Sequence, residues 1–134
     1  MQRHSWLAVS RGLQLRPRHH LETLGFQDAL DAEWADLWVK FCYQRMYTRS
    51  IVDDKTRLLV MVGNCIAVRE MIEGRAHMRG ALRAGASPRE VMEVIIQSCV
   101  NFGMPPMVQS LKAFVRILAD EGRLAEIGNP KLPD

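Results

Sequence analysis

The stretch EMIEGRAHMRGALRAGASPREVMEVI, residues 70–95, decides the fold class of this chain. Its first part predicts a helix over about 70–84, and Gly85 is typical of the residue that closes a helix at its C-terminal end. Ser87 then begins a second helix as its N-cap, with proline at the first helical position and Glu90 completing a capping box. The stretch therefore predicts two helices joined by a short turn.

Helical periodicity continues on both sides of this stretch. Residues 28–46 place apolar side chains three and four apart, with acids toward the first turn and bases toward the last, as the helix dipole favours. Asp53 is expected to cap a helix over 54–68 that is apolar almost all round, a pattern typical of a helix buried on most sides or covered by a second subunit. Two more helices are expected, over 88–102 and 106–121.

The predicted fold is all-α, a bundle of about five to six helices. No segment alternates with a period of two, and no Asn-Gly or Asp-Gly pair marks a hairpin. Gly63 lies inside a predicted helix, where it costs about 1 kcal/mol relative to Ala, and it predicts a close helix crossing. Small residues on the following helix would allow another close approach, namely Gly80, Ala81 and Ala84.

Size and composition fit one soluble globular domain of 134 residues, with 48% hydrophobic and 25% charged residues. The longest apolar stretch, residues 58–68, is about half of the roughly 20 residues that span a bilayer. The first ten residues lack the continuous apolar segment of a secretory signal. We therefore expect a cytoplasmic protein with no membrane partner.

The net charge of +3 is unevenly distributed along the chain. Residues 1–20 contain four arginines and no acid, whereas the remainder contains 14 basic and 15 acidic residues. A fold that binds nucleic acid would carry the basic excess on its folded part, so no nucleic-acid partner is expected. We assign residues 1–24 to a basic N-terminal arm, 25–123 to the helical domain and 124–134 to a C-terminal tail.

Glu70, Glu73 and His77 form the one constellation of chemical groups in the sequence. Their spacing of i, i+3 and i+7 would stack them on one helix face. Two carboxylates beside an imidazole can act in general acid–base catalysis, because crowding or burial raises the pKa of one carboxyl and a carboxylate keeps the imidazole protonated. The alternative is an exposed, ion-paired helix face worth a few tenths of a kcal/mol. A metal site is not expected, because a di-iron carboxylate bundle repeats Glu-x-x-His on several helices and this chain lacks that repeat.

Arginines offer a second kind of candidate site. Arg57 opens an otherwise apolar helix, and because a buried guanidinium needs an anionic partner, it is the candidate anion clamp. Arg75, Arg79 and Arg83 follow one another at intervals of four and are expected to form a solvated helix face.

Other groups predict no site. His19 and His20 adjoin a proline in the arm and are expected to be exposed. The three cysteines, Cys42, Cys65 and Cys99, form no CxxC pair and are interpreted as small buried hydrophobic residues. Because the chain has no GxGxxG, GxxxxGK or GxSxG motif, neither a nucleotide cofactor nor the common serine hydrolase arrangement is expected.

Six short motifs follow one another along the chain: Lys55-Thr56-Arg57-Leu58-Leu59, Glu73-Gly74-Arg75-Ala76-His77, Ala81 to Gly85, Ser87-Pro88-Arg89-Glu90, Glu93-Val94 and Gly103-Met104-Pro105. In their order and spacing they resemble the carboxymuconolactone decarboxylase family, which shares its fold with the alkylhydroperoxidase AhpD proteins. The resemblance covers about residues 25–120.

The resemblance also distinguishes two branches of that fold. The AhpD branch carries Cys-x-x-Cys-x-x-x-His, and counting back from His77 the cysteine positions are occupied here by Glu70 and Glu73. A carboxylate forms neither the thiolate nor the disulfide of a thiol peroxidase. The resemblance thus implies the decarboxylase-like branch, which is all-helical, cofactor-free and assembled as a homotrimer or homohexamer with pockets near subunit contacts.

On this resemblance we expect a carboxy-lyase that removes CO2 from a carboxylated lactone or related small carbonyl compound. His77 would be the proton donor or oxyanion partner and Glu73 would set its tautomer and charge, while Arg57 would anchor a carboxylate and Glu70 would take part in substrate binding. Two alternatives stay open: an enzyme of this fold acting on an aromatic or polyketide-type substrate in biosynthesis, which the unusual arm supports, and a non-catalytic oligomeric interaction protein.

Overall fold

The computed structural model describes residues 31–128, and within this part every regular element is a helix. The chain divides after Asp54 into two compact units: unit 1 ends at Asp54 and unit 2 begins at Lys55. The arm predicted for residues 1–24 and the last residues of the predicted tail lie outside the described residues. Among the described helices, none has both the length and the apolar character needed to cross a bilayer.

Unit 1 contains α3 (Ala32–Val39), which runs directly into the π-helix η2 (Lys40–Met46). Asp31 caps α3, because its carboxylate accepts a hydrogen bond of 2.9 Å from the backbone N–H of Trp34. The predicted apolar face is largely exposed, and Ala35 and Val39 are the buried residues of α3. Periodicity identifies a helix but not the side of it that is covered. The exposed apolar side chains are Trp34, Leu37, Trp38 and Phe41.

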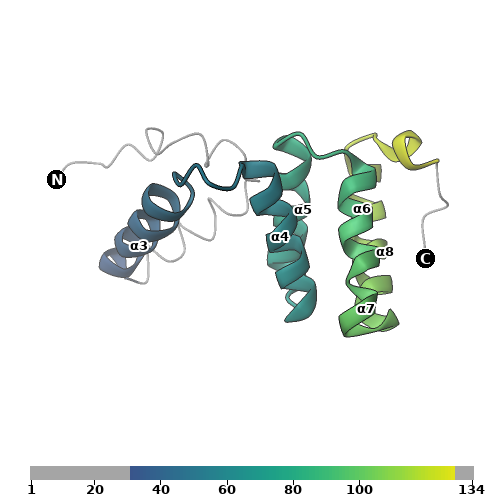
Figure 1. The fold of residues 1–134 in the computed structure, drawn as a ribbon, viewed down its shortest axis with the longest axis horizontal. Coiled ribbons are helices and arrows are strands. Elements are labelled where there is room, and N and C mark those ends of the chain that lie inside the picture. The colour runs from purple at the N-terminus through teal and green to yellow at the C-terminus, as the bar shows by residue number, and fades with distance from the viewer. Residues whose placement is uncertain (1–30, 129–134) are drawn as a thin grey trace. The chain divides into compact units, whose positions relative to one another are not determined.

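Unit 2 holds the remaining helices. They are α4 (Asp54–Ala67), α5 (Met71–Arg83), α6 (Pro88–Gln97), α7 (Cys99–Phe102), α8 (Met104–Asp120) and the 3-10 helix η3 (Leu124–Ile127). Figure 1 shows α4 beside α5 and α6 beside α8. Helix α8 contacts α5, α6, α7 and η3, and so joins these elements together.

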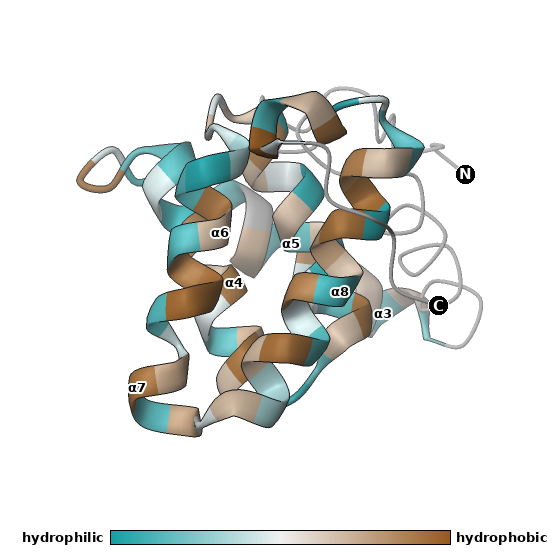
Figure 2. Ribbon diagram, turned by 90° about the vertical axis from the view of Figure 1, so that its right-hand side faces the viewer, coloured by the Kyte–Doolittle hydropathy of each residue, from teal (hydrophilic) through white to brown (hydrophobic). Residues whose placement is uncertain are grey.

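The core of unit 2 takes one apolar stripe from each long helix. It includes Ile66 of α4, Met78 of α5, Ile95 of α6, and Phe114 and Ile117 of α8. Figure 2 shows hydrophobic and hydrophilic residues alternating along α6 and α8, as amphipathic helices require. Burial of these side chains stabilises the unit by about 1.5–3 kcal/mol for each large apolar group.

The predicted stop at Gly85 is confirmed. Gly85 has a φ of +93°, which a glycine adopts without the steric cost that a side chain would bring. The N–H of Ala86 donates to the carbonyl of Ala81 at 2.9 Å, and the N–H of Gly85 donates to the carbonyl of Leu82 at 3.2 Å. These two bonds form a Schellman motif that ends α5.

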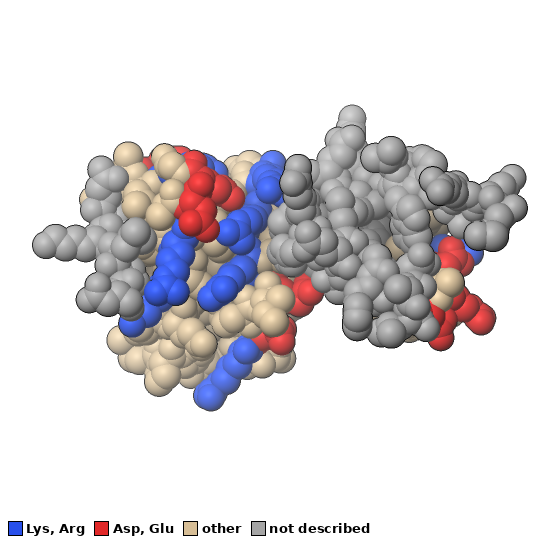
Figure 3. Space-filling model, turned by 180° about the vertical axis from the view of Figure 1, so that it is seen from behind, with Lys and Arg blue, Asp and Glu red and all other residues tan. Residues whose placement is uncertain are grey.

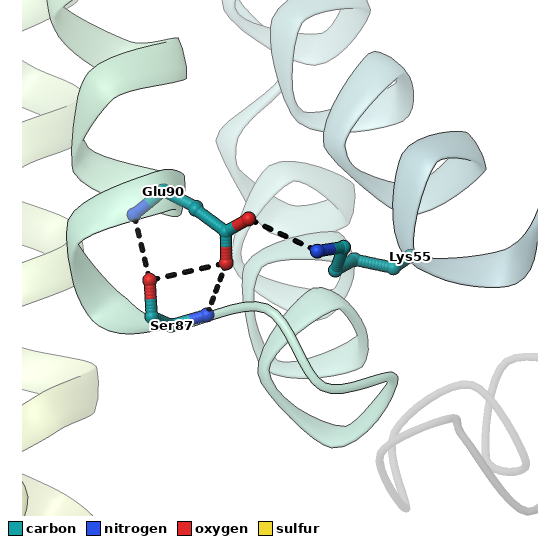
Figure 4. Close-up of polar contacts among 3 residues, drawn as sticks. All are labelled: Lys55, Ser87 and Glu90. Atoms are coloured by element: carbon teal, nitrogen blue, oxygen red, sulfur yellow. Dashed lines mark hydrogen bonds and ion pairs between the residues drawn. The ribbon is translucent and has the colours of Figure 1, made fainter.

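The predicted start at Ser87 is also confirmed (Figure 4). Ser87 Oγ accepts from the N–H of Glu90 at 3.2 Å, and the Glu90 carboxylate accepts from the N–H of Ser87 at 2.8 Å. Lys55 Nζ, from the first turn of α4, donates to the same carboxylate at 3.0 Å. The hydrogen bond from the Ser87 backbone, followed by that from Lys55, lowers the pKa of Glu90 to about 2. The capping box therefore also ties α6 to α4.

Two expectations about α4 differ from the structure. An added Cβ at Gly63 would lie 3.8 Å from Cγ1 of Val94, an ordinary contact distance, so the crossing is looser than predicted. Only one side of α4 is buried within unit 2, because Val60 is exposed while Leu58 and Val62 are buried. Coverage of the other side by a second subunit stays a prediction.

The ends of the last two predicted helices also shift. The expected helix over 88–102 is interrupted at Ser98, whose Oγ donates to the carbonyl of Ile95 at 2.6 Å. A hydroxyl that bonds back to the preceding turn competes with the regular helical pattern. Gly103, with a φ of +82°, separates α7 from α8, which begins at Met104 rather than at residue 106.

Candidate active site

The site is built on the tight connection between α4 and α5. Only three residues separate the two helices, and Arg69 among them has a φ of +58°. The N–H of Glu70 donates to the carbonyl of Cys65 at 2.9 Å, which folds the chain back on itself. The end of α4 consequently lies against the start of α5: a Cβ added at Gly74 would be 3.4 Å from that of Cys65.

Glu70 is the N-cap residue of α5 and does not lie within the helix. The helix begins at Met71, and the Glu70 carboxylate accepts a hydrogen bond of 2.9 Å from the N–H of Ile72. The predicted stack of three side chains over two helical turns is therefore wrong in its first member. The physical reason is that the first N–H groups of a helix have no partner inside the helix, and this carboxylate satisfies one of them.

Glu73 and His77 lie on α5 as predicted and point toward each other. His77 Nε2 is 3.9 Å from Glu73 Oε2, longer than a hydrogen bond but within ion-pair range. The imidazole is only 6% exposed, whereas the carboxylate is 36% exposed. The pair therefore places a buried imidazole beside a carboxylate that solvent can reach.

Cys65 lies close to Glu70 and Glu73, which form an acidic turn at the start of α5, and the sequence did not predict this proximity. The side chain is a free thiol and is buried. Burial, followed by the negative charges of Glu73 and Glu70, raises the pKa of Cys65 to about 11. The thiol is thus protonated at neutral pH and is a poor nucleophile. The short connection between two helices predicts an antiparallel pair, and this was the available indication of the contact.

Arg57 lies in the first turn of α4 and is partly buried, with its Nε inaccessible to solvent. It precedes Cys65 by eight residues, or roughly 12 Å along the helix axis. In the antiparallel pair this separation places Arg57 and the acidic turn at opposite ends of α4. The structure therefore groups Glu70, Glu73 and Cys65 at one end of the helix pair and places Arg57 toward the other end. His77 follows Gly74 by about one turn of α5 and so lies between these ends.

Two cavities of unit 2 lie elsewhere, and neither is lined by His77 or Glu73. One, of about 380 Å³, runs between α4 and α6 and is lined by residues that include Asn64, Glu93 and Phe102. The other, of about 260 Å³, lies between α5 and α8. Within residues 31–128, no group of three His, Cys, Asp or Glu residues is arranged to hold a metal ion.

The comparison with known proteins shows which family the chain belongs to. An uncharacterized 15.0 kDa protein of the nqo9-nqo10 intergenic region of Paracoccus denitrificans is 31% identical over 94 residues, covering 69% of this chain and 67% of that protein. The profile of the carboxymuconolactone decarboxylase family matches residues 32–116, from the first residue of α3 into α8. That family includes decarboxylases and AhpD-like peroxidases on one helical fold. The match spans all of α4, α5 and α6, and the chain belongs to the carboxymuconolactone decarboxylase family.

Proposed function

We propose that this protein is a cofactor-free carboxy-lyase of the decarboxylase-like branch, acting on a carboxylated lactone or a related small carbonyl compound. The observation that carries the proposal is the buried His77 beside the half-exposed Glu73, 3.9 Å apart on α5. A buried imidazole beside a carboxylate suits proton transfer, because the carboxylate stabilises the charged form that burial alone would disfavour.

The reaction needs one proton and one stabilised oxyanion. When the bond between the substrate carbon and its carboxylate breaks, CO2 leaves and the electron pair spreads through the double bond onto the lactone carbonyl oxygen. In our proposal the His77 imidazolium returns a proton to carbon, and the neutral imidazole then takes up a proton from solvent by way of Glu73. Arg57 would bind the substrate carboxylate, and Glu70 would border the substrate from its position at the start of α5.

Peroxide reduction is the other chemistry of this family, and the local groups do not favour it. Glu70 and Glu73 stand where the resemblance places the two thiols of the peroxidase branch. Cys65 is close to them, but its pKa of about 11 keeps it as a thiol at neutral pH. A peroxidatic cysteine needs the thiolate, and we therefore propose that the protein is not a thiol peroxidase.

We further propose that the site is completed in a homotrimer or homohexamer. The acidic turn is flanked by two exposed apolar side chains, Val68 at 74% and Ile72 at 72% exposure. Apolar groups of this size on both sides of a polar site favour coverage by another protein surface. A second copy of this chain seated there would exclude water from Glu73 and strengthen its interaction with His77.

The test measures CO2 release from a panel of carboxylated lactones, together with the molar mass in solution by light scattering. His77→Ala should lower turnover by about 10²–10⁴-fold without changing the molar mass. Glu93→Gln, which removes an exposed carboxylate from the cavity between α4 and α6, is the matched control and should keep turnover within twofold. If His77→Ala retains turnover, or if it only dissociates the oligomer, the catalytic role of His77 is refuted.

A further inference from the structure

The second cavity of unit 2 lies on the opposite side of α5 from the acidic turn. Helices α5 and α8 run in the same direction. Ser110 Oγ, in the first half of α8, contacts Met71 Sδ at the start of α5 at 3.5 Å, and Asp120 at the end of α8 contacts Arg79 in the last turns of α5. Between them lies the cavity of about 260 Å³. Its apolar lining is small and buried, because it comes largely from Ala113 and Ile117 of α8.

Three basic residues and one acidic residue line this cavity. The basic residues are Arg75 and Arg79 of α5 and Arg116 of α8, and the acidic residue is Asp120. Figure 3 shows the back of the molecule, where basic side chains of unit 2 lie close to one another beside a small acidic group. The cavity therefore has a net positive lining.

Arg79 is fixed in place by acids and is not the solvated residue that its spacing predicted. Its Nη2 is 3.3 Å from Asp120 Oδ2, and its Nε is 3.7 Å from Glu121 Oε1. The side chain is only 25% exposed. The single lining carboxylate, Asp120, is thus already engaged by Arg79.

Arg75 and Arg116 are the remaining cations of the cavity. Both are exposed, and across residues 31–128 neither forms an ion pair within 4.0 Å. They come from different helices but line one concave surface. Guanidinium groups present paired N–H donors that match the adjacent oxygens of a phosphate or carboxylate group.

We propose that this cavity binds a small oxyanion with two or more negative charges, held between Arg75 and Arg116 over the apolar floor of α8. The site is separate from His77 and from the proposed reaction. Its small volume favours a compact ligand over a nucleic-acid strand, whose phosphates extend along a surface and are bound by long basic stripes.

The test uses the full chain, with pyrophosphate and citrate as probes in separate calorimetric titrations at low ionic strength, where exposed charges are least screened. Arg75→Gln combined with Arg116→Gln should weaken binding by about 100-fold, roughly tenfold for each guanidinium. The matched control is Arg45→Gln combined with Arg89→Gln, two exposed arginines outside the cavity, and it should change affinity less than twofold. Thermal melting of each variant verifies that it is folded.

The probes and one further variant separate the possible results. Tighter binding of pyrophosphate identifies a phosphate ligand, and tighter binding of citrate identifies a polycarboxylate. Ala119→Glu keeps every arginine but adds a negative charge to the cavity lining, so it should also weaken binding. Equal losses in the double variant and its control would show diffuse charge attraction and overturn the proposal. The proposal would also be overturned if neither probe bound, or if a DNA oligonucleotide bound more tightly than pyrophosphate and citrate.

Discussion

Helix α5 carries two pairs of polar residues with the same spacing and opposite surroundings. Glu73 and His77 form one pair and Arg75 and Arg79 the other, and the two pairs lie about 200° apart around the helix axis. His77 is 6% exposed and meets one carboxylate, whereas Arg79 meets two carboxylates at the edge of a basic cavity. Identical i, i+4 spacing therefore gives a buried acid–imidazole pair on one face and a cation held by two acids on the other, according to what the neighbouring helices present.

The largest expected effect separates the two faces of α5. His77→Ala should reduce CO2 release from the proposed lactone substrate by about 10²–10⁴-fold. It should leave pyrophosphate affinity unchanged, because Arg75 and Arg116 lie on the other face. Turnover assays and calorimetry on the same preparation give both numbers. A parallel loss of pyrophosphate binding would mean that the two faces are coupled and that the comparison fails.

The reactivity of the Cys65 thiol is a direct probe of the negative charges of Glu73 and Glu70 beside it. With a pKa raised from 9.0 to about 11, its thiolate fraction below pH 9 is roughly 100-fold smaller than that of an unperturbed thiol, so alkylation by iodoacetamide should be slow at pH 8. Removing a nearby negative charge in Glu73→Gln should lower the pKa and accelerate alkylation at pH 9. Rates for the Cys65 peptide are measured by mass spectrometry, with Arg75→Gln as the charge control on the other face.

The same thiol makes the folded protein sensitive to alkali. The folded pKa of Cys65 lies above that of the unfolded chain, so between about pH 9 and 11 the unfolded chain binds fewer protons than the folded one. This contribution to stability is present below pH 9 and is lost as the pH rises toward 11. Cys65→Ser should remove that part of the alkaline dependence in urea titrations. An unchanged pH profile would contradict the raised pKa.

The sequence predicts local turns better than it predicts surfaces. Gly85 and Ser87 were placed correctly because a positive φ and a capping box depend on adjacent residues alone. The apolar face that carries Trp34 was predicted from periodicity, but this pattern does not say what covers the face, and Trp34 is half-exposed. Glu70 was expected on the helix face, but the turn at Arg69 sets where the helix starts.

The candidate site was predictable to the same degree. The approach of Glu73 and His77 follows from one helical turn, and the structure bears out their proximity. The contact with Cys65 and the cavity beside Arg75 depend on how α4 and α8 pack against α5. Helical spacing alone contains no information about such neighbours. The solvated face predicted from the arginine spacing is confirmed for the exposed Arg75 and Arg83, but not for Arg79, which contacts two acids.

Loss of the cap at Ser87 should lower stability without altering either face of α5. Ser87→Ala removes the acceptor of the Glu90 N–H and should cost about 1 kcal/mol in the free energy of unfolding. Ser87→Gly should cost only a few tenths of a kcal/mol, because glycine lets water reach the helix end. Urea denaturation gives the two values. Both variants should keep pyrophosphate affinity and the slow alkylation of Cys65, so a change in either would show that the faces respond to global stability.

The smallest expected effect is a gain in stability from Gly63→Ala. A glycine inside a helix costs about 0.5–1 kcal/mol relative to alanine, and the added methyl would meet only Cγ1 of Val94, at 3.8 Å. Because that distance is an ordinary contact, the free energy of unfolding should rise by up to about 1 kcal/mol, measured by urea denaturation against the parent chain. Gly74→Ala is the matched comparison: its methyl would lie 3.4 Å from the Cβ of Cys65, so the tighter fit should offset the gain in helix propensity. If Gly63→Ala destabilised the protein and Gly74→Ala did not, the tighter helix contact would be that of Gly63 with Val94, between α4 and α6. The contact of Gly74 with Cys65, between α5 and α4, would then be the looser one.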